Sequence, residues 1–147
     1  MGSSNARKQD VSRFEKCSKE RKKESRKFTL RQNFALRSQG ALIVSCFYGT
    51  MIAIENIYQR KSDHYAALYI ELPRPVSKKG LHTWPGGRYL RAFCKGSWKN
   101  ISRRYEEILA YAQKERLTLY GYSYETGINE SVINTFDDYI TQIEIPI

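Results

Sequence analysis

The residues with the clearest chemical potential lie near the C-terminal end, in the run Tyr122-Ser123-Tyr124-Glu125. This run places one carboxylate in a segment that is otherwise aromatic and small. Aromatic faces attract a cation, and a carboxylate among them balances the charge of a cation that has left water. We therefore expect a site for an apolar, positively charged small molecule, with Glu125 as its counter-charge. The candidate walls are rings that strand alternation places near acidic groups: Tyr69, Trp84, Tyr89, Phe93, Tyr122 and Tyr139.

Few other residues suggest catalysis. His64 and His82 lie in loop-like sequence, and Cys17, Cys46 and Cys94 are widely spaced with no Cys-x-x-Cys pair. Neither pattern is typical of a metal site, and no glycine-rich phosphate loop follows a strand, so we expect no metal and no cofactor. Glu125 together with Tyr124 or Tyr122 has the groups needed for general acid-base work on a bound reactive molecule. Binding without catalysis is thus the leading interpretation, and an enzyme is the alternative.

Four elements in the C-terminal half would position these residues. Apolar side chains recur at helical spacing over residues 101–116, which predicts an amphipathic helix. A turn at Pro85-Gly86-Gly87 precedes an alternating strand over residues 88–95. Two further strands are expected over residues 120–125 and 139–145. The predicted order is strand, helix, strand, strand.

An internal repeat extends this order to the first half of the chain. The run Tyr69-Ile70-Glu71-Leu72-Pro73 matches Gln142-Ile143-Glu144-Ile145-Pro146. Similarity at one spacing indicates a duplication, with repeats at about residues 28–75 and 84–147. We expect an α+β fold in which a duplicated β-α-β-β unit forms one antiparallel sheet with helices on one face. The projected first strand of the earlier copy falls on the charged run at residues 16–23, which has no strand pattern.

The N-terminal quarter differs in composition from the rest. Residues 1–40 hold 12 Lys and Arg against 4 Asp and Glu, so most of the net charge of +10 lies there. A basic segment at one end does not by itself indicate nucleic-acid binding by the folded part. The stretch contains no proline, so a basic helical tail is predicted over residues 7–39, merging into the helix of the first repeat. Residues 1–6 resemble a cloning scar, and residues 40–147 form the expected domain.

The sequence has no signal-peptide pattern, and its longest apolar run, residues 41–48, is too short to cross a bilayer. We expect no membrane partner. The odd number of scattered cysteines favours a reducing, cytoplasmic location.

Taken together, several motifs resemble one known family. They are Trp84-Pro85-Gly86-Gly87-Arg88-Tyr89-Leu90, then Lys95-Gly96, a helix carrying Tyr105 to Tyr111, then Gly121-Tyr122-Ser123-Tyr124-Glu125, and finally Tyr139 to Pro146. This series is similar to the effector-binding domain of MerR-type multidrug-responsive transcription regulators, which is also called the gyrase-inhibitor-like domain. The similarity covers residues 84–147 well and residues 49–73 fairly.

The resemblance implies a duplicated domain that captures lipophilic, often cationic, small molecules between its halves. Glu125 matches the family's buried counter-charge. The basic tail resembles a linker helix through which two subunits can pair, and DNA would be contacted only through a domain that is not in this chain. Two alternatives remain from the same resemblance: a free-standing hydrolase of a reactive small molecule, and a protein-binding module whose basic tail recognises an acidic surface.

Overall fold

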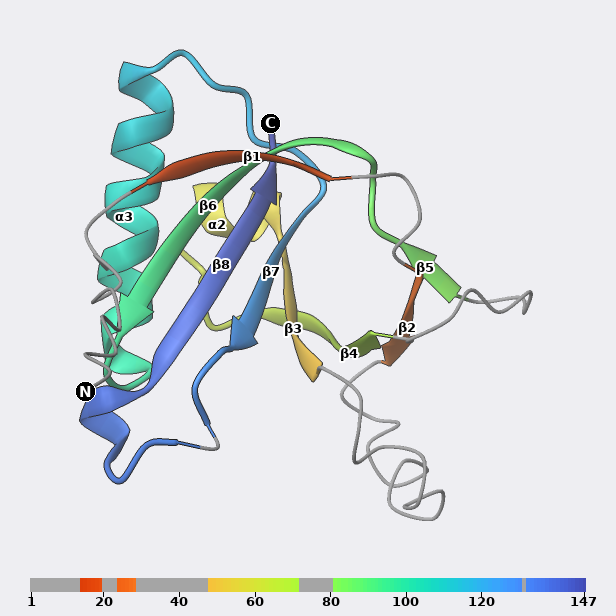
Figure 1. Ribbon diagram of the computed structural model, residues 1–147. Helices are drawn as coiled ribbons and strands as arrows, with labels where there is room; N and C mark the ends of the chain where they lie inside the picture. Colours follow the sequence, from red (N-terminus) through yellow and green to blue (C-terminus); the bar gives the residue numbers. More distant parts are fainter. Residues whose placement is uncertain (1–13, 20–23, 29–47, 72–80, 131) are drawn as a thin grey trace, which may run out of the picture.

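The computed structural model describes residues 14–19, 24–28, 48–71, 81–130 and 132–147. Within them, eight strands form one antiparallel sheet in the order β1-β6-β8-β7-β3-β4-β2-β5 (Figure 1). The strands are β1 Glu15–Lys19, β2 Glu24–Phe28, β3 Tyr48–Ala53, β4 Tyr65–Glu71, β5 Leu81–Thr83, β6 Gly87–Lys95, β7 Tyr122–Gly127 and β8 Ile140–Pro146. The helices are α2 Ile54–Tyr58, α3 Lys99–Lys114 and the 3₁₀ turn η2 Phe136–Asp138. One antiparallel sheet combined with helices is the predicted α+β class, so this part of the fold prediction is confirmed.

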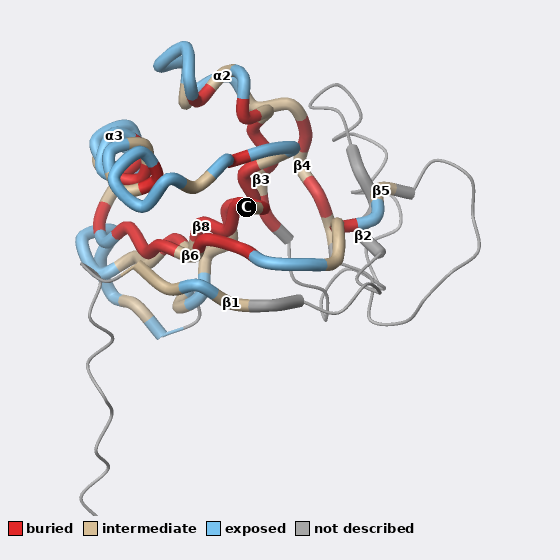
Figure 2. Tube along the Cα trace, turned by 90° about the horizontal axis from the view of Figure 1, so that it is seen from above, coloured by how far each residue is buried: buried red, intermediate tan, exposed pale blue. Residues whose placement is uncertain are grey.

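One face of the sheet packs against the two α-helices. The apolar stripe of α3, with Ile101, Tyr105 and Ile108, is buried against β6 and β8. The α2 residues Ile54 and Ile57 belong to the same core. Strand residues beneath α2 and α3 are therefore buried, as the red segments of the tube in Figure 2 show. The predicted elements at residues 88–95, 101–116, 120–125 and 139–145 correspond to β6, α3, β7 and β8, with shifts of one or two residues at their ends.

The opposite face carries an aromatic core. Because side chains alternate along a strand, residues next to those facing the helices point to this second face. A cluster of six buried residues gathers there from β3, β4, β6, β7 and the turn before β6: Met51, Ala67, Tyr69, Trp84, Tyr89 and Tyr124. The rings of Trp84 and Tyr124 stack with centroids 4.2 Å apart, and Tyr69 meets both edge-on. Each face of the sheet thus has its own core.

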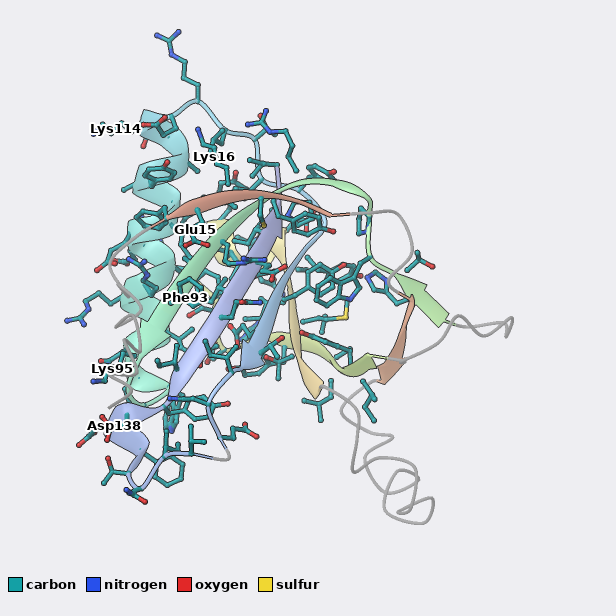
Figure 3. All side chains as sticks on the ribbon, viewed as in Figure 1. Glu15, Lys16, Phe93, Lys95, Lys114 and Asp138 are labelled. Atoms are coloured by element: carbon teal, nitrogen blue, oxygen red, sulfur yellow. The ribbon has the colours of Figure 1, made fainter. Side chains whose placement is uncertain are left out.

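The expectation of an N-terminal helix is wrong for the part of that segment that the structure describes. Glu15–Lys19 and Glu24–Phe28 are strands, and β1 includes residues 16–19 of the charged run, the part of it that the structure describes. The helix prediction depended on composition without an apolar stripe, and such a weak preference yields to tertiary contacts. Here β1 pairs with β6, Phe14 stacks on Tyr111 with centroids 4.4 Å apart, and Lys16 lies 3.7 Å from Glu115. Figure 3 shows Glu15 and Lys16 where β1 crosses toward α3. The other residues of the predicted tail lie outside the described ranges.

Helices in the described part of the chain fall short of the length and apolarity that a bilayer span needs.

Candidate functional site

The carboxylate of Glu125 is the centre of the site, and two neighbouring strands position it. In the pairing of β3 with β7, Thr50 lies directly opposite Glu125, so both side chains project to the helix-covered face. Thr50 Oγ1 donates a hydrogen bond to Glu125 Oε2 at 2.9 Å. Only 5% of Glu125 is exposed. A buried carboxylate is rare without compensating partners, and one of them comes from the adjacent strand.

Helix α3 supplies the second partner. Tyr105 lies on its buried stripe and donates from Oη to Glu125 Oε1 at 2.7 Å. The same hydroxyl lies 2.7 Å from Ser123 Oγ, two residues before Glu125 on the same face of β7. Each carboxylate oxygen therefore accepts one hydroxyl hydrogen bond, which fixes the group in one orientation. Each oxygen keeps acceptor capacity for a further donor.

A β-bulge brings Tyr65 to the same face. Along β3 the partner changes from Ala67, opposite Met51, to Tyr65, opposite Ile52, so Ala66 is the extra residue. A bulge redirects the side chains that follow it. Without it, Tyr65 and Leu68 would point to opposite faces because they are three positions apart. With it, both line the same cavity as Glu125.

These side chains enclose a cavity of about 340 Å³. Glu125 and Thr50 lie at its floor, and Tyr65, Leu68 and Ile101 contribute apolar walls. The remaining lining comes from the turn between β6 and α3 and from the connection between β7 and β8: Gly96, Ser97, Trp98, Glu130, Phe136 and Tyr139 among others. Trp98 is 74% exposed and Phe136 is 81% exposed, which places both rings at the open side.

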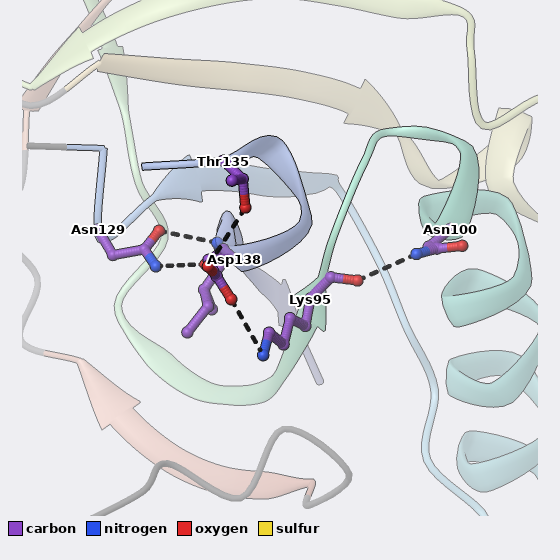
Figure 4. A network of polar contacts seen from close by, with 6 residues as sticks. Lys95, Asn100, Asn129, Thr135 and Asp138 are labelled. Carbon is purple, nitrogen blue, oxygen red and sulfur yellow. Dashed lines mark hydrogen bonds and ion pairs between the residues drawn. The ribbon is translucent and has the colours of Figure 1, made fainter. Parts of the chain in front are cut away.

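A polar network joins the two segments at this open side (Figure 4). Lys95 Nζ lies 3.4 Å from Asp138 Oδ1, and Asn129 donates to the carbonyl of Asp138 at 2.6 Å. Asn129 also accepts from the N–H of Ile140 at 2.8 Å, while Asn100 donates to the carbonyl of Lys95 at 3.1 Å. The network thus ties the segment carrying Phe136 and Tyr139 to the segment carrying Trp98. These contacts hold the two segments that border the open side of the cavity at fixed positions relative to each other.

The electrostatics of the floor follow from burial. Burial raises the pKa of the Glu125 carboxyl, and the hydrogen bonds from Tyr105 and Thr50 oppose that rise. Burial, followed by the nearby Glu125 charge, raises the pKa of Tyr65 to about 12 and that of Tyr105 well above its ordinary value. The two tyrosines therefore keep their protons at neutral pH, and Tyr105 remains a donor. Burial disfavours the ionised form of Glu125, and a cation beside it would favour that form.

The charge of the lining contrasts with that of the chain. Although the protein carries a net charge of +10, the described residues around the cavity include two carboxylates, Glu125 and Glu130, and no lysine, arginine or histidine. The part of the lining that the structure describes is thus negatively charged, although the protein as a whole is basic. Attraction of a cation into such a hollow is stronger than the net charge suggests.

The structure divides the residues predicted for the site between the two faces of the sheet. Glu125 and Tyr139 line the cavity. Tyr69, Trp84 and Tyr89 belong to the aromatic core of the opposite face, and Tyr122 packs against it. Phe93 is buried on β6, between Ala92 and Cys94, which face the helices, so alternation directs it to the other face, and it does not line the cavity. Tyr69 still contacts the backbone of β7, because its hydroxyl donates a hydrogen bond to the carbonyl of Glu125 at 3.4 Å.

The alternation rule also separates Glu125 from the tyrosines considered for acid-base work. Tyr124 and Tyr122 are one and three positions away, which is the opposite face of β7. The carboxylate instead meets Tyr105, which the sequence pattern places in the apolar stripe of the helix, and Tyr65. The sequence does contain one indication of this face: Ser123, a small polar residue two positions from Glu125, lies on the same face of β7. Trp98 and Phe136 had no signal in the sequence pattern.

Within the described ranges, no group of three or more His, Cys, Asp or Glu side chains is arranged to hold a metal ion. Neither family models nor curated proteins provide a parallel for the site: no family model matches the chain, and the search of curated proteins finds no significant match.

Proposed function

We propose that this protein is a small-molecule-binding domain that captures a lipophilic cation in the cavity above Glu125. The observation that carries the proposal is the buried carboxylate at the cavity floor, held by Thr50 and Tyr105. In the fuller form of the proposal, the domain is the effector-binding part of a MerR-type transcription regulator, as the resemblance of residues 84–147 implies. Ligand binding would then favour one conformation of the regulator over another.

The dimensions and lining of the cavity support a drug-sized, mainly apolar ligand. Ligand cavities usually measure about 300–1,000 Å³ and combine apolar walls with a few placed polar groups. The cavity of about 340 Å³ lies at the small end of that range. Its walls include Leu68, Ile101 and the rings of Tyr65 and Trp98, whereas its floor is a single hydrogen-bonded acid. A small aromatic molecule with one positive group matches this division.

The acid at the floor favours a cation over a neutral or anionic ligand. An ionised carboxylate removed from water loses hydration that two hydroxyl donors only partly replace. A cation beside it restores the lost stabilisation, whereas an anion would repel it. A neutral hydrogen-bond donor satisfies a lone pair but leaves the charge uncompensated. Discrimination by charge is therefore the expected property of the site.

The regulator form of the proposal also draws on an internal symmetry, which we propose to be the result of duplication. The order β6-β8-β7 on one side of the sheet centre is mirrored by β2-β4-β3 on the other, and β3 pairs with β7 between them. Each outer strand comes from the other half: β1 pairs with β6, and β5 pairs with β2. In this reading the first strand of the earlier repeat is β2, not the run at residues 16–23. The helix expected in the first repeat falls outside the described residues.

The direct test is binding of a fluorescent cation and its neutral counterpart. Thioflavin T carries a permanent positive charge, and its parent benzothiazole without the N-methyl group is neutral and nearly the same size. We expect thioflavin T to bind with the higher affinity and to quench Trp98, which lines the cavity. A Leu68→Trp variant fills the cavity and should abolish binding. A tryptophan at an exposed position outside the cavity, Tyr58→Trp, should leave binding unchanged. Equal affinity for the two dyes would remove the basis of the proposal.

A second candidate function, hydrolysis of a reactive small molecule, is favoured by one contact. Tyr105 Oη lies 2.7 Å from Glu125 Oε1, so a buried phenol is within proton-transfer distance of the acid at the cavity floor. The test is turnover of a small cationic ester. Product formation that disappears in Glu125→Gln and Tyr105→Phe would favour the enzyme, whereas binding without turnover favours the sensor.

A further inference from the structure

Three hydroxyl groups form a directed chain of hydrogen bonds that ends at Glu125. An ionised carboxylate only accepts hydrogen bonds, so the proton of Tyr105 Oη points to Glu125 Oε1 at 2.7 Å. A phenol has one proton to donate, so Ser123 Oγ, which lies 2.7 Å from Tyr105 Oη, donates its own proton to Tyr105. Thr50 donates to Glu125 Oε2 at 2.9 Å. The protons of the three hydroxyl groups are therefore all directed toward the acid.

The floor of the cavity consequently presents acceptors to a ligand. Tyr105 and Ser123 are buried and do not line the cavity, whereas Thr50 and Glu125 do. The hydroxyl oxygen of Thr50 keeps lone pairs, but its proton already lies in the bond to Glu125. The carboxylate offers about four acceptor positions, and the two hydroxyl groups occupy one on each oxygen. A ligand group that contacts Thr50 and Glu125 therefore forms hydrogen bonds to them only by donating.

A protonated amine and a quaternary ammonium ion behave differently at such a floor. The amine carries N–H groups, which form charge-assisted hydrogen bonds of about 2.7–2.9 Å to a carboxylate. The carbon groups around a quaternary nitrogen provide no N–H donor and hold the positive charge further from the acid, where Coulomb attraction is weaker. Only 5% of Glu125 is exposed, so a small ammonium group approaches its carboxylate more closely than a bulky head group does. Hydrogen bonding and distance both favour the amine.

We infer that the cationic group captured at Glu125 is a protonated amine, and that the site selects against quaternary ammonium ions with the same aromatic group. The inference rests on the proposed function and narrows it to amines. The ammonium group donates to Glu125 and to the hydroxyl oxygen of Thr50. The apolar remainder of the ligand contacts the walls formed by Leu68, Ile101 and Tyr65.

The test uses two naphthalene cations and a neutral isostere of each. Naphthylmethylamine, which is protonated at neutral pH, is compared with trimethyl(naphthylmethyl)ammonium. Ethylnaphthalene and neopentylnaphthalene have the corresponding shapes without charge, so the ratio of their Kd values measures the effect of size alone. Equilibrium dialysis of the full-length protein gives all four Kd values from naphthalene fluorescence in the protein-free chamber.

The amine should bind more tightly than the quaternary ion by about 10- to 100-fold beyond the ratio of the neutral pair. This range is the net effect of a hydrogen bond to a charged group, with hydration of the separate partners already included. In Glu125→Gln this excess should fall about five- to tenfold, because a hydrogen bond to a neutral amide is weaker. The control Glu55→Gln removes an exposed charge on α2, outside the cavity lining, and should leave the excess unchanged.

The outcomes separate this inference from the proposed function. The selection of amines is overturned if the two cations differ only as their neutral isosteres do, if the quaternary ion binds more tightly, or if Glu125→Gln keeps the full excess. Cation capture still stands in those cases when each cation binds more tightly than its own isostere. If neither cation binds more tightly than its isostere, the inference and the proposed function both fail.

Discussion

Replacing Glu125 by glutamine tests the role of charge at the cavity floor without changing its shape. The side chain keeps its size, and both hydroxyl partners can still be satisfied: the amide oxygen accepts from one hydroxyl, and the amide group donates to the other. Tyr105 can adjust in this way because its hydroxyl also lies 2.7 Å from Ser123 Oγ. The substitution therefore removes the negative charge and leaves the hydrogen-bond geometry nearly intact.

The expected loss of affinity follows from Coulomb attraction. A cation about 4 Å from the carboxylate, at an effective dielectric constant of about 20, gains roughly 4 kcal/mol. Part of this gain is spent on ionising a carboxyl whose pKa is raised by burial, at about 1.4 kcal/mol per pKa unit above the assay pH. We expect a net loss of about 2–4 kcal/mol, which is about a 30- to 1,000-fold rise in Kd for thioflavin T.

The assay is a fluorescence titration of both thioflavin T and its neutral parent against wild type, Glu125→Gln and the surface control Glu55→Gln. The neutral dye should bind wild type and Glu125→Gln with affinities equal to within about threefold, because its contacts are apolar and unchanged. The predicted difference is thus specific to the combination of ligand charge and residue charge. The reasoning is refuted if a folded Glu125→Gln protein binds the cation as tightly as wild type, or loses equal affinity for both dyes.

The same variant makes a prediction about stability. Since burial raises the pKa of Glu125 above its unfolded value, the folded state binds the proton more strongly than the unfolded state does. The free energy of unfolding therefore falls as pH rises from the unfolded pKa through the folded pKa. Glutamine does not ionise and escapes this loss. Without ligand, Glu125→Gln should melt at or above the wild-type temperature at about pH 8, with the difference vanishing toward about pH 4.

Three further predictions concern the groups around the acid. Affinity for thioflavin T should fall about tenfold per pH unit below the pKa of unliganded Glu125, because the cation binds the ionised form. Calorimetry in buffers of different ionisation heat should detect proton release on binding. A flat pH profile of affinity with no proton release would contradict this prediction. Thr50→Val removes the donor to Oε2, raises the pKa of Glu125 further and should shift the midpoint of that profile to higher pH, whereas Thr118→Val, at an exposed position outside the cavity lining, should not. Phe14→Ala removes the ring that stacks on Tyr111 and lies 4.4 Å from Arg104. The free energy of unfolding in urea should fall by about 1–2 kcal/mol. An unchanged urea midpoint would show that β1 is not anchored by this ring.

The elements that could be predicted from the sequence are those with a strong periodic signal. Helix α3 carries an apolar stripe at helical spacing, and β6 alternates between glycine breaks, so the sequence pattern predicts both to within two residues. Strands β1 and β2 have no recognisable strand pattern because they are charged and lie in a segment without prolines. Their pairing with β6 and with β4 depends on partners 40 or more residues away, which a local pattern does not report.

Of the candidate site, the sequence predicts the central residue, Glu125, but not most of the side chains that surround it. The sequence pattern identifies Glu125 as an acid in an aromatic strand, but alternation along separate strands does not say which of the candidate rings share the face of Glu125. In a sheet, adjacent positions point to opposite faces, so Tyr124 and the rings around it formed a separate core. The actual neighbours Tyr65 and Tyr105 depend on a bulge in β4 and on the seating of a helix, and Trp98 and Phe136 depend on loop conformation. None of these is encoded by local spacing.

The contacts of Glu125 bear on why an acid occupies this position at all. Threonine, serine and tyrosine hydroxyls could satisfy an amide equally well. An apolar side chain would extend the core that already includes Ile143, opposite Glu125 on β8, and Ile52, opposite Ser123 on β3. Burial works against the ionised acid, and the nearest described hydrogen-bond donors are neutral hydroxyl groups. The acid therefore lowers the stability of the empty protein in the pH range where it ionises. A residue that is unfavourable for the fold, placed at the floor of a cavity, is the pattern expected where a charged ligand supplies the missing compensation.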